Sequence, residues 1–146
     1  MMADDEAPLY TIGYEGRTPQ DFMGLLAQNG VSTLLDVRIR PNSRKPGFSK
    51  SRLGLACQEA GLVYQHDPRL GTPIEILDAY KDTGEYDWDA YRAFLDTQTD
   101  AVEALSALAT RHRVALLCYE ADAGICHRRF VADEATKLHG GSIVDL

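Results

Sequence analysis

The chain has 146 residues, of which 45% are hydrophobic and 25% charged, and its formal net charge is −7. This length fits one domain with a proper hydrophobic core, and the negative charge argues against a protein that coats itself in nucleic acid. Three irregularly spaced cysteines exclude a disulfide-stapled scaffold, and no apolar run approaches the ~20 residues that cross a bilayer. We therefore expect a cytoplasmic protein with no membrane partner, in which residues 1–8 form a disordered lead and residues 9–146 a single domain.

The N-terminal part alternates strands with a helix. Residues 9–13, LYTIG, read as a first strand. Thr18 then supplies an N-cap, Pro19 fits the first helical position, and Gly30 ends the helix. The nearly all-apolar run 33–37 is typical of a strand that is buried on both faces.

A basic loop follows this second strand. Residues 38–52 hold six of the 15 basic residues and no acidic residue. One basic loop on an otherwise acidic molecule would focus its field on an anionic ligand, although a solvated, flexible loop has the same composition. Ser49 or Ser51 can cap the next helix, which Gly61 ends, and residues 62–66 read as the third strand.

The second half of the chain is predicted to continue this alternation. Turn signals make residues 67–87 the least regular stretch, where we expect a short helix between loops. The remaining predicted elements are a helical stretch over 88–112 with a break near 97–99, a strand over 114–119, a helix over 126–139 and a strand over 142–144. The pattern predicts an α/β fold: a single domain with a mainly parallel sheet of about five strands and helices on both faces.

Polar residues follow each predicted strand. Ligands of open α/β sheets bind at the carboxyl ends of the strands, so these residues should meet in one pocket. They are Tyr14, Glu15 and Arg17 after the first strand, Asp36, Arg38, Arg40, Arg44 and Lys50 at and after the second, His66 and Arg69 at and after the third, and Cys118, Glu120, Cys126, His127 and Arg128 around the fourth.

Residues 116–131, LLCYEADAGICHRRFV, gather most of these reactive side chains at one strand-to-helix turn. A helix N-terminus attracts anions through its unpaired N–H groups and its dipole. We expect Arg38, Arg44 and Arg128 to bind an anion together with this helix start.

Acidic side chains near the same edge are candidates for proton transfer. Glu120 is the principal acid or base candidate, and Glu15 is a second one, because a carboxylate among cations stays ionised. The alternative is that these acids only position the arginines. For Asp36 and Arg38, which point to the same side of a strand end, the spacing favours an ion pair.

The thiols allow several interpretations. Cys126 stands in electropositive surroundings and is either a nucleophile, an oxidisable thiol or a packing residue at a helix start, whereas the apolar setting of Cys118 favours the core. A phosphatase-type loop needs an arginine six positions after its cysteine, but Gly124 and Ala132 occupy those positions. An adjacent Cys-His pair without a spaced CxxC partner does not fit a zinc site, so we expect no metal and no cofactor.

Four segments of this chain carry motifs that are found together, in the same order, in a known protein family. They are TIGYEGRTPQDF at 11–22, LLDVRIRPNSRKPGFSKSRL at 34–53, Gly61 to His66 with Leu70-Gly71, and LLCYEADAGICHRRFVADE at 116–134. Together they resemble the family known as "domain of unknown function" 488, DUF488. The resemblance implies a small single-domain α/β protein with its motifs clustered at one pocket, and it implies no particular reaction. Residues 72–110 match least, which is where differences in substrate would lie.

Two classes of function remain open at this point. The first is an enzyme that acts on a phosphate-bearing substrate: a nucleotide, a nucleoside derivative or a nucleic-acid end. The alternative is a non-catalytic module that binds nucleic acid or a nucleotide through the basic loop 38–52. A redox-sensing thiol at Cys126 is a third interpretation, and the sequence does not determine the oligomeric state.

Overall fold

A computed structural model describes residues 7–41, 43, 45–119 and 127–146. The described residues form a five-stranded sheet with the order β3-β2-β4-β1-β5, in which all neighbouring strands are parallel. The strands are β1 (Leu9–Gly13), β2 (Thr33–Asp36), β3 (Val63–His66), β4 (Val114–Cys118) and β5 (Ile143–Asp145). The predicted α/β fold is confirmed.

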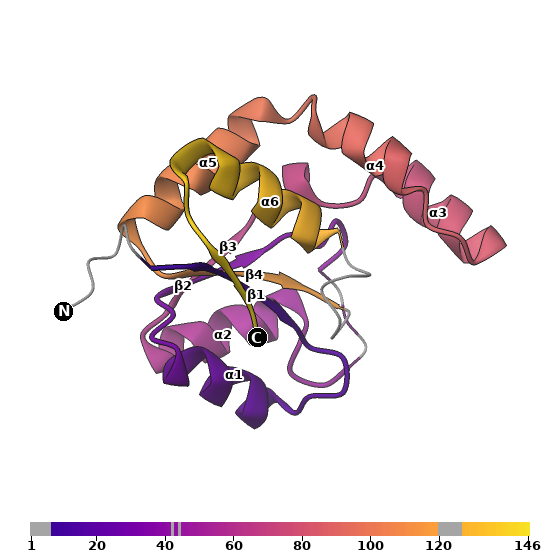
Figure 1. Cartoon of the computed structure of the whole chain (residues 1–146). Helices are drawn as coiled ribbons and strands as arrows, with labels where there is room; N and C mark the ends of the chain where they lie inside the picture. Colours follow the sequence, from indigo (N-terminus) through magenta and orange to yellow (C-terminus); the bar gives the residue numbers. More distant parts are fainter. Residues whose placement is uncertain (1–6, 42, 44, 120–126) are drawn as a thin grey trace.

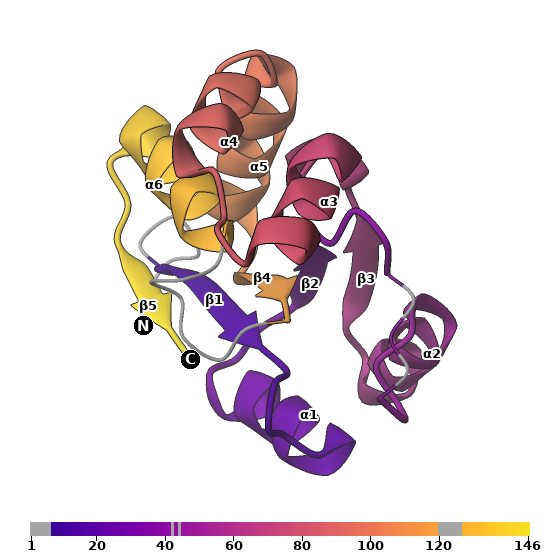
Figure 2. The same cartoon turned by 90° about the vertical axis from the view of Figure 1, so that its right-hand side faces the viewer.

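Helices cover both faces of this sheet (Figure 1). The helices α1 (Pro19–Gln28) and α2 (Lys50–Ala60) lie on one face, and α5 (Thr99–Arg111) and α6 (Arg128–His139) lie on the other. Two more, α3 (Ile74–Thr83) and α4 (Trp88–Leu95), project past the carboxyl ends of the strands on the side of α5 and α6 (Figures 1 and 2). A short 3₁₀ helix, η2 (Pro68–Leu70), precedes α3.

The core consists of two apolar layers, one on each face of the sheet. All five residues of β1 and of β4 are buried, as expected for strands that are covered on both sides. Successive β4 residues serve opposite layers: Leu116 packs with Leu105 and Val131, and Leu117 packs with Phe22. The edge strand β3 instead alternates between exposed and half-buried residues.

Element boundaries depart from the predictions by one or two residues. The predicted break in the 88–112 stretch is confirmed, since α4 ends at Leu95 and α5 begins at Thr99. The helix predicted over 126–139 begins at Arg128, with His127 as its N-cap residue, and residue 126 lies outside the described residues. Of the lead expected to be disordered, 1–8, the structure describes only Ala7, which is buried, and Pro8.

The topology places a crevice between β2 and β4, which are neighbours in the sheet. From β2 the chain proceeds to α2 on one face, and from β4 it proceeds to α6 on the other face (Figure 1). Connections that leave adjacent strands in opposite directions open a ligand-binding crevice at the carboxyl edge of an α/β sheet.

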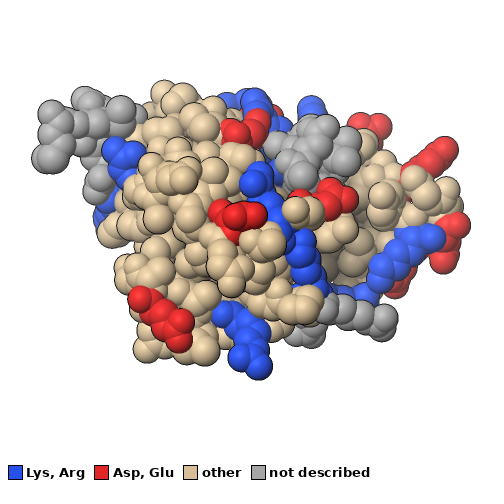
Figure 3. Space-filling view, turned by 90° about the horizontal axis from the view of Figure 1, so that it is seen from below, with Lys and Arg blue, Asp and Glu red and all other residues tan. Residues whose placement is uncertain are grey.

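Charged side chains alternate in sign on the face seen from below in Figure 1. Lys and Arg side chains form a broken band across this face, and acidic side chains lie on both sides of the band (Figure 3). The cations on this face are therefore interspersed with acids instead of forming a patch of one sign.

Candidate functional site

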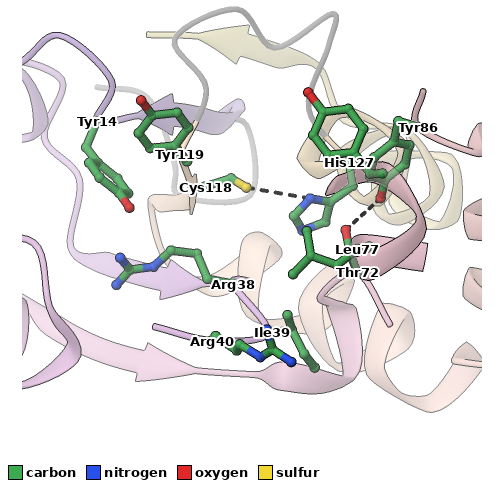
Figure 4. Close-up of a pocket in the computed structure, with 11 residues that line it drawn as sticks. Tyr14, Arg38, Ile39, Arg40, Thr72, Leu77, Tyr86, Cys118, Tyr119 and His127 are labelled. Carbon is green, nitrogen blue, oxygen red and sulfur yellow. Dashed lines mark hydrogen bonds between the residues drawn. The ribbon is translucent and has the colours of Figure 1, made fainter. Parts of the chain in front are cut away.

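A cavity of about 180 Å³ lies where β2 and β4 end. Its lining comes from the ends of three strands, from the start of α6 and from the segment that contains α3 (Figure 4). The lining residues are Tyr14, Arg38, Ile39, Arg40, Thr72, Leu77, Tyr80, Tyr86, Cys118, Tyr119 and His127. The cavity thus lies at the crevice that the topology predicts.

Cys118 and His127 form a side-chain pair at the wall of this cavity (Figure 4). The distance between Cys118 Sγ and His127 Nδ1 is 3.5 Å, and both residues are buried apart from the face that borders the cavity. Cys118 is the last residue of β4 and His127 is the N-cap residue of α6, so the strand-to-helix turn brings them together.

The other ring nitrogen of His127 fixes the tautomer. His127 Nε2 lies 3.1 Å from the carbonyl oxygen of Val37, which can only accept a hydrogen bond. Nε2 therefore carries the proton, and in the neutral ring Nδ1 is an acceptor that faces the Cys118 thiol. The ring of Tyr91 packs edge-on against the imidazole, with 5.3 Å between the ring centroids, and limits its rotation.

Asp36 and Arg38 form a buried ion pair beside the cavity. The Arg38 guanidinium donates through Nε and through Nη2 to the two carboxylate oxygens of Asp36, over 2.8 and 2.6 Å. Burial alone would lower the pKa of Arg38, but the hydrogen bonds and the charge of Asp36 raise it above its ordinary value. Burial also raises the pKa of Tyr64, and its hydrogen bond to Asp36 raises it further.

The same arginine fastens the basic loop to the sheet. Arg38 Nη1 donates to the carbonyl oxygen of Phe48 over 2.7 Å, and the guanidinium lies over the Tyr14 ring, 5.3 Å from its centroid. Lys45 Nζ donates to the carbonyl oxygen of Tyr14 over 3.0 Å. By contrast, Arg40 is exposed and lines the cavity, and no described residue makes a hydrogen bond or an ion pair with it.

The structure brings together only part of the set that the sequence assigned to one pocket. Tyr14, Arg38, Arg40, Cys118 and His127 line the cavity. Asp36 does not line the cavity but forms an ion pair with Arg38, which does. Residues that lie elsewhere are Arg17, Lys50 and His66, which line three other surface hollows, Arg69, which lines the same hollow as His66, the exposed Glu15, and the fully buried Arg128.

Local contacts explain why Arg17, His66 and Lys50 lie away from the cavity. Arg17 Nε donates to the carbonyl oxygen of Gly13, and His66 Nε2 donates to that of Arg38 over 2.7 Å. Lys50 is the first residue of α2 and is exposed at its start. One pocket for every residue that follows a strand was therefore too broad a prediction, because a twisted sheet of five strands spreads its carboxyl ends over several hollows.

Three residues of the predicted site, Arg44, Glu120 and Cys126, lie outside the described residues. Their assigned roles, as an anion contact, an acid or base and a nucleophile, stay predictions.

Four lining residues come from residues 67–87, the stretch for which the sequence predicted the least regular structure. They are Thr72, Leu77, Tyr80 and Tyr86. Thr72 Oγ1 and the Tyr86 hydroxyl share a hydrogen bond of 2.6 Å, which closes the loop around α3 at the cavity wall (Figure 4). The only sequence signal for this wall was the Gly-Thr-Pro turn, which does not reveal that the following helix packs near the strand ends.

The described residues offer neither a metal-binding cluster nor a membrane-spanning helix. No three His, Cys, Asp or Glu side chains among residues 7–41, 43, 45–119 and 127–146 lie close enough together to hold a metal ion. None of the helices formed by these residues is both long and apolar enough to cross a membrane.

Comparisons with known proteins identify a family. A search of curated proteins found no match, and neither did a search of solved structures. The family model described as "Domain of unknown function DUF488" matches residues 18–135, most of the chain and nearly all of the cavity lining. The resemblance carried by the motifs is thereby confirmed, and the chain belongs to the DUF488 family.

Proposed function

We propose that the protein is an enzyme that acts on a phosphate-bearing substrate with an aromatic ring: a nucleotide, a nucleoside derivative or a nucleic-acid end. The observation that carries the proposal is one cavity at the sheet's crevice where tyrosine rings, an exposed arginine and a Cys-His pair meet. Pockets of this kind, mostly apolar with a few convergent polar groups, are where α/β proteins bind their ligands.

Aromatic side chains on two sides of the cavity support the choice of a ring-bearing ligand. Tyr14 and Tyr119 meet edge to face with 5.2 Å between centroids, and Tyr119 exposes 46% of its surface. Tyr80 and Tyr86 form a second edge-to-face pair across the opening, with centroids 5.8 Å apart. Exposed aromatic rings stack on nucleobases with little dependence on sequence.

Arg40 supports the choice of an anion. Arg38 is already neutralised by Asp36 and held by Phe48, so it contributes less to phosphate binding than the sequence predicted. The exposed guanidinium of Arg40, which no described residue engages, is suited to a bidentate contact with phosphate.

The size of the cavity limits how much of a substrate it holds. A volume of about 180 Å³ is below the roughly 300–1,000 Å³ of pockets that enclose a drug-sized ligand. One end of the substrate, a base or a phosphate, would enter, and the rest would lie over Tyr119. This favours a nucleotide or a nucleic-acid end over a long segment.

The structure favours nucleic-acid binding by the basic loop 38–52 less than it favours ligand binding in the cavity. Of its cations, Arg38 is buried in an ion pair and Lys45 is hydrogen-bonded to the backbone of Tyr14. Both therefore serve the protein's own structure, which leaves fewer cations for phosphates than the composition of residues 38–52 implied.

Thermal unfolding with a panel of ligands tests the proposal. Nucleoside mono- and diphosphates should raise Tm, whereas inorganic phosphate and free nucleosides should do so less. At about 100 times Kd, linkage adds about 2.7 kcal/mol, which corresponds to roughly 5–10 °C for a chain of this length. Arg40→Ala and Tyr119→Ala should reduce the shift.

Arg52→Ala is the matched control, because Arg52 is an exposed cation of the same basic segment, in the first turn of α2, and does not line the cavity. An equal loss of the ligand-induced shift in Arg40→Ala and Arg52→Ala would assign binding to the loop. Ligands that raise Tm are then incubated with the protein, and conversion is followed by ³¹P NMR and chromatography. Binding without any conversion would leave the non-catalytic module as the better description.

A further inference from the structure

We infer that Cys118 and His127 form a nucleophile and base pair, in which Cys118 Sγ attacks an electrophilic carbon. The sequence placed Cys118 among the pocket residues, although its apolar setting favoured the core, and Cys126 was the candidate nucleophile, so the structure assigns this chemistry to a different thiol. The pair itself is defined by contacts within the protein and does not depend on which ligand the cavity takes. Only the class of substrate rests on the proposed function.

The hydrogen-bond roles of the imidazole set the direction of proton transfer. Since Val37 holds the proton of His127 on Nε2, the lone pair of Nδ1 points at Cys118 Sγ over 3.5 Å. When the thiol proton moves to Nδ1, the resulting imidazolium keeps its Nε2–H bond to the carbonyl and faces the thiolate with its new N–H. A thiolate is the nucleophilic form of cysteine, and a neighbouring histidine base is a common way to generate it.

Three segments of the chain hold the pair in place. Cys118 ends β4, His127 begins α6, and the Val37 carbonyl follows β2. That carbonyl is itself confined, because a Cβ at Gly71 would lie 3.0 Å from the Val37 oxygen and 2.8 Å from the backbone nitrogen of Ile39. A nucleophile, a base and a third group that orients the base are the parts that cysteine-dependent active sites share.

Cys57 provides a contrasting thiol in the same chain. It belongs to α2, its side chain is fully buried in the apolar layer between this helix and the sheet, and burial raises its pKa to about 11. Cys57 therefore remains protonated and enclosed. Cys118 instead lines a cavity and faces an imidazole, which is the setting of a reactive cysteine.

The chemical step balances within the pair and the substrate. The thiol proton passes to His127 Nδ1 while Sγ forms a bond to the electrophilic carbon. The leaving group departs with the electron pair of the bond that breaks, and it takes the proton from His127. Carbon is the expected target, because residue 124, six positions after Cys118, is a glycine and not the arginine that a phosphatase-type loop needs.

Alkylation by iodoacetamide tests the inference without any substrate. The unaltered protein is labelled for a series of times at pH 7.5, once folded and once in 8 M urea, and each thiol is followed by tandem mass spectrometry. Fragment ions are needed, since Cys118 and Cys126 lie in the same tryptic peptide, 114–128. Cys118 should react at least about fivefold faster in the folded protein than in urea, whereas Cys57 should react more slowly when folded.

Two histidine variants identify the base. His127→Asn keeps a polar atom near Sγ but cannot accept the proton, and it should slow the alkylation of folded Cys118 at least about tenfold. His139→Ala is the matched control, because His139 also bonds a side chain through Nδ1, Ser106 Oγ at 2.7 Å, but does not line the cavity. Its rate should stay within about twofold of the unaltered protein.

The inference is overturned if Cys118, like Cys57, reacts more slowly in the folded protein than in urea. It is also overturned if folded His127→Asn labels Cys118 at the unaltered rate. Should His127→Asn not fold, the comparison of folded and urea-unfolded chains decides alone. A reactive Cys118 in a protein that no nucleotide stabilises would reject the proposed substrate class and keep the pair.

Discussion

Two ion pairs with the same spacing show how burial decides the weight of an interaction. In Asp36–Arg38 and in Asp67–Arg69 the arginine donates through Nε and Nη2 to both oxygens of an aspartate two residues earlier. The side chains of Arg38 and Asp36 expose 7% and 0%, whereas those of Arg69 and Asp67 expose 52% and 17%. Only the buried pair leaves an uncompensated charge in the interior when one partner is lost.

Asp36→Asn should therefore lower the free energy of unfolding by about 3–5 kcal/mol, because it leaves the buried Arg38 guanidinium without a counter-ion. Urea denaturation followed by circular dichroism measures the loss. Asp67→Asn is the control and should shift the urea midpoint far less, since water solvates Arg69. Equal shifts in the two variants would mean that the buried pair has no special role.

The sequence revealed these two residues more readily than it revealed their role. Period-two alternation in a strand places Asp36 and Arg38 on one side, and this predicted an ion pair. Their assignment to ligand binding came from their place at the strand end. It did not include the hydrogen bonds from the Arg38 backbone and from Tyr64, which come from the neighbouring loop and from β3 and occupy the carboxylate further.

At the scale of elements, strands and helices with clear periodicity were predictable and the wall of the cavity was not. The buried runs of β1, β2 and β4 have no polar alternation, so their type and approximate bounds followed from local sequence. Helix α3 carries no buried side chain, and its place depends on contacts with distant segments. Residues 67–87 therefore gave turn signals but no indication that Tyr80 and Tyr86 reach the cavity.

The turn before α3 contacts the end of β2 through Gly71, which makes a specific prediction possible. Gly71→Ala would place a Cβ within 3.0 Å of the backbone at residues 37 and 39, and backbone cannot yield as a flexible side chain does. We expect a loss of about 1–3 kcal/mol in the free energy of unfolding. The displaced Val37 carbonyl should also slow alkylation of Cys118, because it orients His127.

A second glycine provides the control for this substitution. Gly24 lies inside α1, and an added Cβ there would have no packing neighbour within 4 Å, so Gly24→Ala should raise the free energy of unfolding by about 0.5–1 kcal/mol. Urea titrations of both variants, with thiol labelling alongside, separate the two effects. Unchanged stability and labelling in Gly71→Ala would show that the β2 end adapts freely.

At the scale of the whole molecule, strand order decided which predicted residues meet. Alternating strands and helices predicted a parallel sheet, but the order β3-β2-β4-β1-β5 depends on pairings between strands that are far apart in the chain. Because β2 and β4 are neighbours, Arg38 and Arg40 lie opposite Cys118 and Tyr119 at one cavity. His66 on the edge strand β3 lies in a separate hollow for the same reason.

Nucleic-acid binding at the cavity and nucleic-acid binding at the basic loop 38–52 should differ in their salt dependence. An anionic ligand approaches a chain of net charge −7, so local cations must supply the attraction. If only the end of a nucleic acid enters the cavity, one or two phosphates are neutralised. For single strands, log K should then fall with log[salt] at a slope of about −0.7 to −1.4, whereas six loop cations would give about −4.

Fluorescence anisotropy with a labelled single-stranded oligonucleotide, from about 50 to 300 mM NaCl, measures this slope. We expect the shallow slope, because Arg38 and Lys45 are engaged within the protein and Arg40 faces the cavity. Arg40→Ala should then weaken binding more than Arg52→Ala, and a 5′-phosphate on the oligonucleotide should strengthen it. A slope near −4 that both variants reduce equally would instead assign nucleic-acid binding to the basic loop 38–52, with the cavity uninvolved.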